Sequence, residues 1–345
     1  MVHDLISKVI PPLFFPVDVS PYRQSFPFST NSMKAILMTV KSKQRPNWIA
    51  VDWGTTNLRV WIVDENEQIA AHCTSVKNTG MRAPSAFEPA LLEVISGYLS
   101  EDFITPVLIC GMAGAREGWV DAGYLTTPCP PLDARQGVVA PTNDPRMRVR
   151  ILPGVKQISP PDIMRGEETQ IAGFLLKQPE FDGVMCLPGT HTKWVKISAK
   201  GIEHFQTFMT GELFTLLSKS SVLSHVIAAK GWHDAAFTEA VSKSLNDPGI
   251  PISQLFSLRA EALVGELAPV EARARLSGHL IGAELRACRA FWQGREIVVL
   301  GDEIIARAYY KALESQGVDL ISVDADPMTL AGLKAAFTWQ EDTFR

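Results

Sequence analysis

The chain has 345 residues, of which 46% are hydrophobic and 20% charged, so it is long and apolar enough to form two globular domains. Its formal net charge of −4 provides no overall basic surface, which argues against nucleic acid as a partner. No apolar run approaches the roughly 18 residues of a membrane-spanning helix, so we expect no membrane partner. The five cysteines are scattered without CxxC spacing, which favours a reducing cytoplasm over a structural zinc site.

The first segment, residues 1–46, differs in composition from the rest of the chain. It is rich in proline and phenylalanine and shows neither a helical nor a strand period. It also lacks the basic start, the long apolar stretch and the small-residue cleavage site of a signal peptide. We therefore expect a poorly ordered N-terminal extension.

Two apolar runs between Trp48 and Asp64 predict a β-hairpin with an unusual turn. The turn region carries an acid, a glycine, two threonines, an asparagine and a cation, at Asp52, Gly54, Thr55, Thr56, Asn57 and Arg59. Glycine lets backbone N–H groups face an anion, threonine hydroxyls donate hydrogen bonds, and the acid can hold a metal ion through water. The residues alone therefore indicate a phosphate-binding turn.

The next elements are a predicted strand at 67–77, a helix at 88–99 and a buried strand at 107–110. The buried strand ends at a glycine, and a loop of small residues leads on to Arg116, Glu117 and Trp119. Loops that follow strands are where open α/β sheets bind ligands. A simple turn with a surface ion pair explains the same residues equally well.

Residues 148–157 alternate as a strand, and two prolines then separate this strand from a helix predicted from about residue 162. The helix carries two adjacent acids, Glu167 and Glu168. Helical spacing places one of them toward the buried side of the helix. The alternative is that both acids are there because carboxylates favour the N-terminal end of the helix dipole.

A second hairpin is predicted at 184–197, with the turn PGTHT followed by Lys193. It repeats the order of the first hairpin: apolar strand, glycine, hydroxyls, apolar strand. Two such turns in one chain suggest that both grip one polyphosphate. From residue 205 on, the pattern is mostly helical, but a strand at 297–300, Gly301 and a helix at 303–313 could either seat a nucleotide or form a short turn. A strand at 318–324 and a closing helix end the fold.

Five motifs occur in order along residues 47 to 340: DWGTTNLR, GMAGAREGW, RGEETQ, LPGTHTKW and VVLGDEIIARAYYKAL. Their order resembles the sugar kinases of the actin–hexokinase–Hsp70 superfamily. Within it, MRGEETQ, LPGTHTKWV and MTGEL are closely similar to the 2-dehydro-3-deoxygalactonokinase family. The resemblance implies an α/β fold of two ribonuclease-H-like domains around a central cleft, at 47–157 and 158–345, each with a five-stranded mixed sheet.

The resemblance also implies residue roles, with ATP and Mg²⁺ as cofactors. The first phosphate loop is matched by Asp52, which would hold the metal, and by Gly54, Thr55, Thr56 and Asn57. The second phosphate loop is matched by Gly189, Thr190, Thr192 and Lys193, and the adenosine segment by Gly301 and Asp302. Glu167 matches the place of the catalytic base, with Glu168 as the alternative. Residues on the sugar side would be Arg59, Arg116, Glu117 and Trp119, where Arg116 would suit a carboxylate.

The implied activity is ATP-dependent phosphorylation of the C6 hydroxyl of 2-dehydro-3-deoxy-D-galactonate, a sugar acid of galactonate catabolism. Alternatives are a kinase for another sugar acid such as 2-keto-3-deoxygluconate, a sugar-sensing regulator on the same fold, and an actin- or Hsp70-like ATPase. Residues 1–46 contain too many prolines to supply the helix-turn-helix of a regulator. A homodimer is compatible with the sequence.

Overall fold

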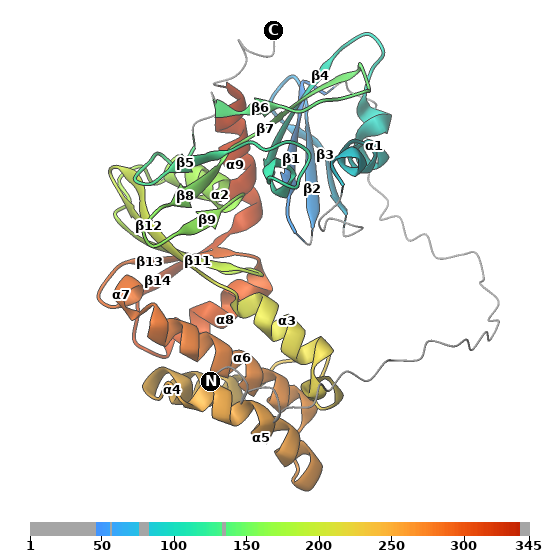
Figure 1. The fold of residues 1–345 in the computed structure, drawn as a ribbon. Coiled ribbons are helices and arrows are strands. Elements are labelled where there is room, and N and C mark those ends of the chain that lie inside the picture. The colour runs from blue at the N-terminus through green and yellow to red at the C-terminus, as the bar shows by residue number, and fades with distance from the viewer. Residues whose placement is uncertain (1–45, 56, 76–82, 133–135, 339–345) are drawn as a thin grey trace, which may run out of the picture. The chain divides into compact units, whose positions relative to one another are not determined.

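A computed structural model describes residues 46–55, 57–75, 83–132 and 136–338, and almost all of the predicted N-terminal extension lies outside these ranges. The described chain folds into two large β-sheets, one small sheet and the helices that cover them (Figure 1). None of the described helices has the length and apolar character needed to cross a membrane.

The first large sheet has six strands in the order β3-β2-β1-β4-β7-β6. Their bounds are β1 Trp48–Trp53, β2 Leu58–Val63, β3 Ile69–Ser75, β4 Thr105–Gly111, β6 Val138–Val139 and β7 Met147–Ile151. The hairpin β1–β2 is antiparallel, whereas β1, β4 and β7 run parallel. Side chains on β1 alternate between the two faces, as strand geometry requires: Ile49 and Val51 pack with helix α1 (Phe87–Ile95), and Trp48 and Ala50 pack on the other face.

The second large sheet repeats this arrangement with five strands in the order β12-β11-β10-β13-β14. Their bounds are β10 Gly183–Leu187, β11 Thr192–Ser198, β12 Gly201–Phe208, β13 Ile297–Gly301 and β14 Leu320–Asp324. Again a hairpin, β10–β11, is antiparallel, and β10, β13 and β14 run parallel. Each sheet thus has a hairpin turn at the carboxyl end of a central strand, where open α/β sheets bind ligands.

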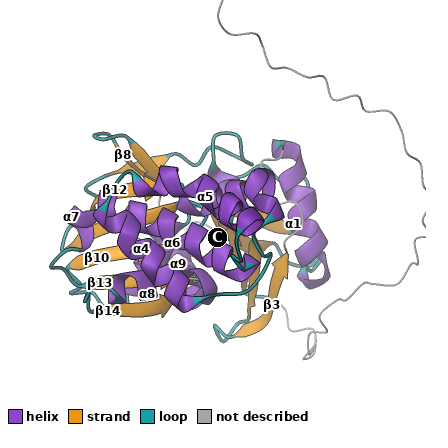
Figure 2. Cartoon of the chain, turned by 90° about the horizontal axis from the view of Figure 1, so that it is seen from below, coloured by secondary structure: helices purple, strands orange, loops and turns teal. Residues whose placement is uncertain are grey.

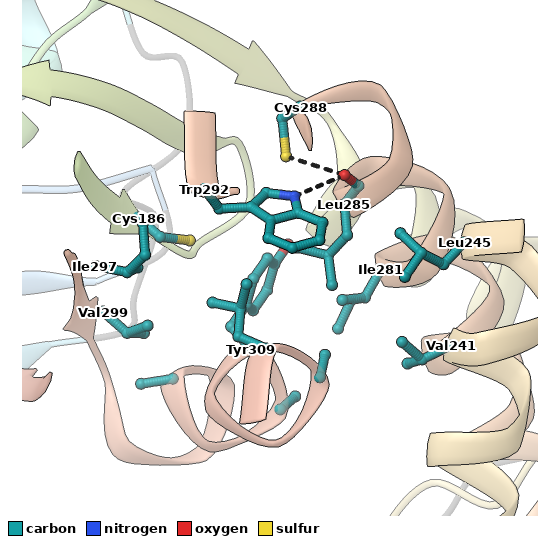
Figure 3. Packing of buried hydrophobic residues seen from close by; sticks show 14 of the residues in the cluster. Cys186, Val241, Leu245, Ile281, Leu285, Cys288, Trp292, Ile297, Val299 and Tyr309 are labelled. Carbon is teal, nitrogen blue, oxygen red and sulfur yellow. Dashed lines mark hydrogen bonds between the residues drawn. The ribbon is translucent and has the colours of Figure 1, made fainter. Parts of the chain in front are cut away.

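Most helices belong to the second half of the chain. Their bounds are α3 Thr210–Ser220, α4 Asp234–Asn246, α5 Ile250–Val264, α6 Pro269–Ala287, α7 Arg289–Trp292 and α8 Glu303–Glu314. Figure 2 shows α4, α6 and α8 stacked over β10, β13 and β14. These strands share one hydrophobic core with α4, α6, α7 and α8. Its side chains include Leu285, Trp292 and Tyr309 (Figure 3).

Two helices, α2 (Glu167–Leu175) and α9 (Ala325–Thr338), contact both large sheets and cross each other. Small residues allow the crossing: a Cβ added to Gly173 would lie 1.9 Å from the backbone oxygen of Met328, and one added to Gly332 would lie 2.1 Å from that of Thr169. Trp48 of β1 stacks on Phe337 of α9 at 4.3 Å between ring centroids. The crossing therefore connects the two halves of the fold.

Four details of the sequence prediction were wrong. Residues 148–157 form two strands in different sheets, because the chain leaves the first sheet after β7 and pairs again as β8 (Gly154–Gln157). Residues 162–164 form β9 (Asp162–Met164), which pairs with β8. Together with β5 (Tyr124–Thr126), these strands form the small sheet. The helix therefore starts only after Gly166, whose φ is +107°. The first sheet has six strands because the two-residue β6 adds to its edge, and β12 was not foreseen.

We expect Gly332→Ala to destabilise the fold by about 1–3 kcal/mol, because the new methyl group meets backbone that cannot rotate away. Urea unfolding followed by circular dichroism measures the change. Gly97→Ala is the matched control, since nothing lies within 4 Å of its Cβ position. Equal stability of the two variants would contradict the close crossing of α2 and α9.

Candidate active site

The first turn, which follows β1, is tight and open to solvent. The Gly54 N–H donates to the Asn57 carbonyl at 2.9 Å, and a Cβ on Gly54 would lie 2.9 Å from the same oxygen. Thr55 and Asn57 are exposed, and the predicted Thr56 lies outside the described residues. The backbone geometry therefore requires glycine at 54 and leaves the turn accessible to a ligand.

Asp52 lies at the base of this turn and is 4% exposed. Its carboxylate pairs with Arg59, and the Cys110 thiol donates to Oδ1 at 3.7 Å. Burial raises the pKa of the Asp52 carboxyl, Arg59 opposes this effect, and the nearby Glu167 adds to it. Arg59 also pairs with Asp326 at the start of α9. Arg59, predicted on the sugar side, is thus held between two carboxylates.

Sequence reasoning missed Asp326, because 267 positions separate it from Arg59. The only local signal is an acid in the first turn of the closing helix, which the helix dipole explains without any partner.

The second turn, between β10 and β11, is built differently. A Cβ on Gly189 would meet nothing within 4 Å, so this glycine borders open space. The start of α3 packs against the turn: a Cβ on Gly211 would lie 2.2 Å from the Gly189 oxygen, and the Glu212 N–H donates to the Thr190 carbonyl at 2.9 Å. His191 Nε2 lies 2.6 Å from Glu212 Oε2. The MTGEL motif therefore belongs to the second turn.

The two residues after this turn are both buried but have different partners. Thr192 is buried, and its Oγ1 lies 2.8 Å from the hydroxyl of Tyr309, which itself donates to a carboxylate. Thr192 must then donate its only proton inward to Tyr309, so its hydroxyl cannot donate to a phosphate in this arrangement. The Lys193 ammonium lies 3.3 Å from Glu167 Oε1 and donates to the His191 carbonyl at 3.3 Å.

The two adjacent acids also differ. Glu167 is 23% exposed, pairs with Lys193, and accepts a hydrogen bond from the Arg165 N–H at 3.0 Å. Glu168 is 1% exposed and accepts from the Gly166 N–H at 2.6 Å and from the Thr169 hydroxyl at 2.9 Å. Burial, with a contribution from Glu167, raises the pKa of Glu168 to about 7. The prediction that one of the two acids is buried is confirmed.

The predicted adenosine segment lies beside the second turn. A Cβ on Gly301, the last residue of β13, would lie 3.0 Å from the Pro188 ring. Asp302 caps α8 by accepting a hydrogen bond from the Ile304 N–H at 3.1 Å.

The predicted sugar loop combines exposed and buried residues. Arg116 and Glu117 are exposed, whereas Trp119 is 6% exposed, stacks near Phe87, and donates from Nε1 to the Pro141 carbonyl at 3.0 Å. Trp119 thus packs beneath the loop, and its role in sugar binding stays a prediction.

Arg165 supports the segment that follows this loop, and sequence reasoning did not single it out. Its guanidinium donates to the Gly123 carbonyl at 2.8 Å and lies over the Tyr124 ring at 4.3 Å.

Comparisons with known proteins agree with these motifs. The family described as 2-keto-3-deoxy-galactonokinase matches residues 52–336. A Rhizobium meliloti (strain 1021) protein named as a probable 2-dehydro-3-deoxygalactonokinase, DgoK1, is 40% identical over 300 residues, which are 84% of this chain and 96% of that protein. The 2-dehydro-3-deoxygalactonokinase of Escherichia coli (strain K12) is 33% identical over 296 residues, again 84% and 96%. The chain belongs to the 2-keto-3-deoxy-galactonokinase family.

A solved structure supports the same conclusion for the fold. The crystal structure of a candidate 2-dehydro-3-deoxygalactonokinase from Sinorhizobium meliloti superposes with a TM-score of 0.76 at 39% identity, and covers 85% of this chain and 99% of that one. The α/β fold that the motifs imply is therefore confirmed, as is the resemblance to this kinase family.

For this member of the 2-keto-3-deoxy-galactonokinase family, we expect Glu168 to make folding stability depend on pH. The folded carboxyl keeps its proton up to a pKa of about 7, whereas the unfolded carboxyl releases it near its ordinary value of 4.5. Between these values the native state binds more protons, so the contribution of Glu168 to stability falls as pH rises, by on the order of 3 kcal/mol.

Urea unfolding of wild type and Glu168→Gln at pH 5 and pH 8 measures this contribution. The variant should gain stability relative to wild type at the higher pH. The exposed Glu180→Gln serves as the control. The raised pKa of Glu168 would be contradicted if the free energies of unfolding of wild type and variant differed by the same amount at both pH values.

Proposed function

We propose that this chain transfers the γ-phosphoryl group of ATP to the C6 hydroxyl of 2-dehydro-3-deoxy-D-galactonate, as a step of galactonate catabolism. The observation that carries the proposal is the pair of Glu167 and Lys193, 3.3 Å apart, which sets an accessible carboxylate beside the second glycine–threonine turn. The substrate class comes from the names of the relatives, whose sequences match nearly the whole described fold. Phosphoryl transfer depends mainly on positioning and on charge stabilisation, and the site offers both.

In this proposal the two turns hold the phosphates. The proposed donors are the backbone N–H of Gly189 and the exposed hydroxyls of Thr55 and Thr190, since the Gly54 N–H donates to the Asn57 carbonyl and the Thr192 hydroxyl is turned inward. Gly301 and Asp302, beside Pro188, would flank the nucleoside. Lys193 adds a positive charge next to the second turn.

Asp52 is the proposed magnesium residue. Magnesium in kinases takes only one or two carboxylates and completes its shell with water and phosphate oxygens. Asp52, a buried carboxylate at the base of the first turn, fits that mode, although no cluster of three or more metal-binding side chains occurs among the described residues. When bound with ATP, the ion neutralises phosphate charge.

Glu167 is the proposed general base, which accepts the proton of the C6 hydroxyl. Its side chain is 23% exposed, whereas the alternative, Glu168, is 1% exposed and is hydrogen-bonded inside the protein. Arg116 is exposed and can pair with the substrate carboxylate through two parallel hydrogen bonds, with Glu117 beside it. Arg59 and Trp119 have less support in this role, because both are engaged by other residues.

The proposal places the reaction in the cytoplasm, where ATP is supplied. None of the five cysteines, all of which lie in the described ranges, forms a disulfide, which fits a reducing compartment. The domain limits at 47–157 and 158–345 and the homodimer stay predictions.

Glu167→Gln should lower kcat by about 10²- to 10⁴-fold, the usual range for loss of a general base, and should change ATP affinity little. Steady-state kinetics and nucleotide titration measure the two quantities. Glu168→Gln is the comparison, and we expect it to keep most of its turnover. An inactive Glu168→Gln beside an active Glu167→Gln would reverse the assignment.

A coupled ADP-release assay over a panel of 2-keto-3-deoxy sugar acids tests the substrate. We expect kcat/KM to be highest for 2-dehydro-3-deoxy-D-galactonate, with its C4 epimer, 2-keto-3-deoxygluconate, as the decisive comparison. A preference for the epimer would assign the chain to the other sugar acid. ATP turnover that no sugar acid stimulates would contradict a sugar kinase.

A further inference from the structure

Glu284 of α6 is a buried carboxyl, 3% exposed, inside the core of the second sheet. Its Oε1 accepts from the Trp194 indole N–H at 2.7 Å, and its Oε2 accepts from the Tyr309 hydroxyl at 2.8 Å. The Thr210 side chain also hydrogen-bonds to it. Tyr309 reaches this position from α8 through packed apolar side chains such as Leu285 and Val299 (Figure 3).

This carboxyl is costly to bury. Burial raises its pKa to about 7, the three hydrogen bonds oppose that shift, and no basic group among the described residues contributes to it. An apolar side chain of similar size would avoid the desolvation cost. The hydrogen bonds themselves therefore indicate what Glu284 does.

Two of these hydrogen bonds lead to the second turn from opposite sides. On one side, Tyr309 connects Glu284 to Thr192, the first residue of β11 after the turn. On the other side, Thr210 begins α3, and the next two residues, Gly211 and Glu212, contact the backbone of Gly189 and Thr190. One carboxyl thus connects the strand that leaves the turn with the helix that packs against the turn.

We propose that Glu284 is a positioning residue for the nucleotide: by holding Tyr309, Thr192 and Thr210, it sets the geometry of the second turn against the ATP phosphates. The inference rests on the proposed function only in assigning this turn to the phosphates. Since Tyr309 donates to Glu284, the Thr192 proton is drawn inward, and the backbone of the turn is held from below while its donors stay free for phosphate.

Tyr309→Phe and Glu284→Gln test this role. Tyr309→Phe removes the hydroxyl that accepts the Thr192 proton. Glu284→Gln replaces one carboxylate oxygen with an NH₂ group, which then faces one of the three side chains that donate to Glu284. We expect Kd for MgADP and KM for ATP to rise on the order of three- to tenfold, as for the loss of one hydrogen bond, with KM for the sugar acid unchanged. Calorimetric titration with MgADP and steady-state kinetics measure these quantities.

Ser244→Ala is the matched control. It removes a buried hydrogen bond of 2.9 Å to His279 on the same helix α6, but Ser244 has no link to the second turn. It should lower Tm and leave Kd for MgADP within twofold of wild type. If Glu284 has only a structural role, all three variants should lower Tm, and KM for ATP should not rise more than KM for the sugar acid.

The inference is overturned if Tyr309→Phe changes Kd for MgADP no more than Ser244→Ala does, or if KM for the sugar acid rises as much as KM for ATP. If Glu284→Gln does not fold, Tyr309→Phe decides alone. Wild-type protein that binds MgADP but phosphorylates no sugar acid would refute the proposed function, and the MgADP titrations would still test Glu284. Wild-type protein that binds no MgADP would refute both.

Discussion

The close crossing of α2 and α9 is the constraint on which the site depends. At Gly173 and Gly332 the two backbones touch, so no side chain can separate them. Both helices also pack on both large sheets, and their mutual position therefore sets where their first residues lie. Those first turns carry Glu167 and Asp326, and the crossing brings them to the charged group around Asp52. Packing of apolar and small residues thus decides where the charges meet.

The two hairpin turns look alike in sequence but are stabilised by different interactions. The first is closed by its own backbone hydrogen bond between Gly54 and Asn57. The second depends on its surroundings: α3 packs against Gly189, and the side chain of Thr192 is held from the core. The first turn is stabilised by its own backbone, whereas the geometry of the second turn depends on contacts with α3, α6 and α8. This difference makes residues on α6 and α8 relevant to the geometry of the second turn.

Local patterns predicted most elements correctly, because hairpins and amphipathic helices depend on residues close together in the chain. Both hairpins, the strand at 107–110, the strand at 297–300 and the closing helix are found where expected. The failures have a common cause. Residues 148–157 and 162–164 have ambiguous local patterns, and their secondary structure depends on pairing with strands elsewhere in the chain. Gly166, with a φ of +107°, then sets the true start of α2.

By itself, the sequence determined the fold family, the two glycine–threonine turns and the presence of two adjacent acids, since these follow from short ordered motifs. Only the tertiary structure decided which acid stays partly exposed: Glu168 is enclosed by Gly166 and Thr169, and Glu167 meets Lys193. It also turned the Thr192 hydroxyl inward and brought Asp326 to Arg59. The physical reason is that burial and ion pairing depend on neighbours contributed by distant segments, which no local spacing encodes.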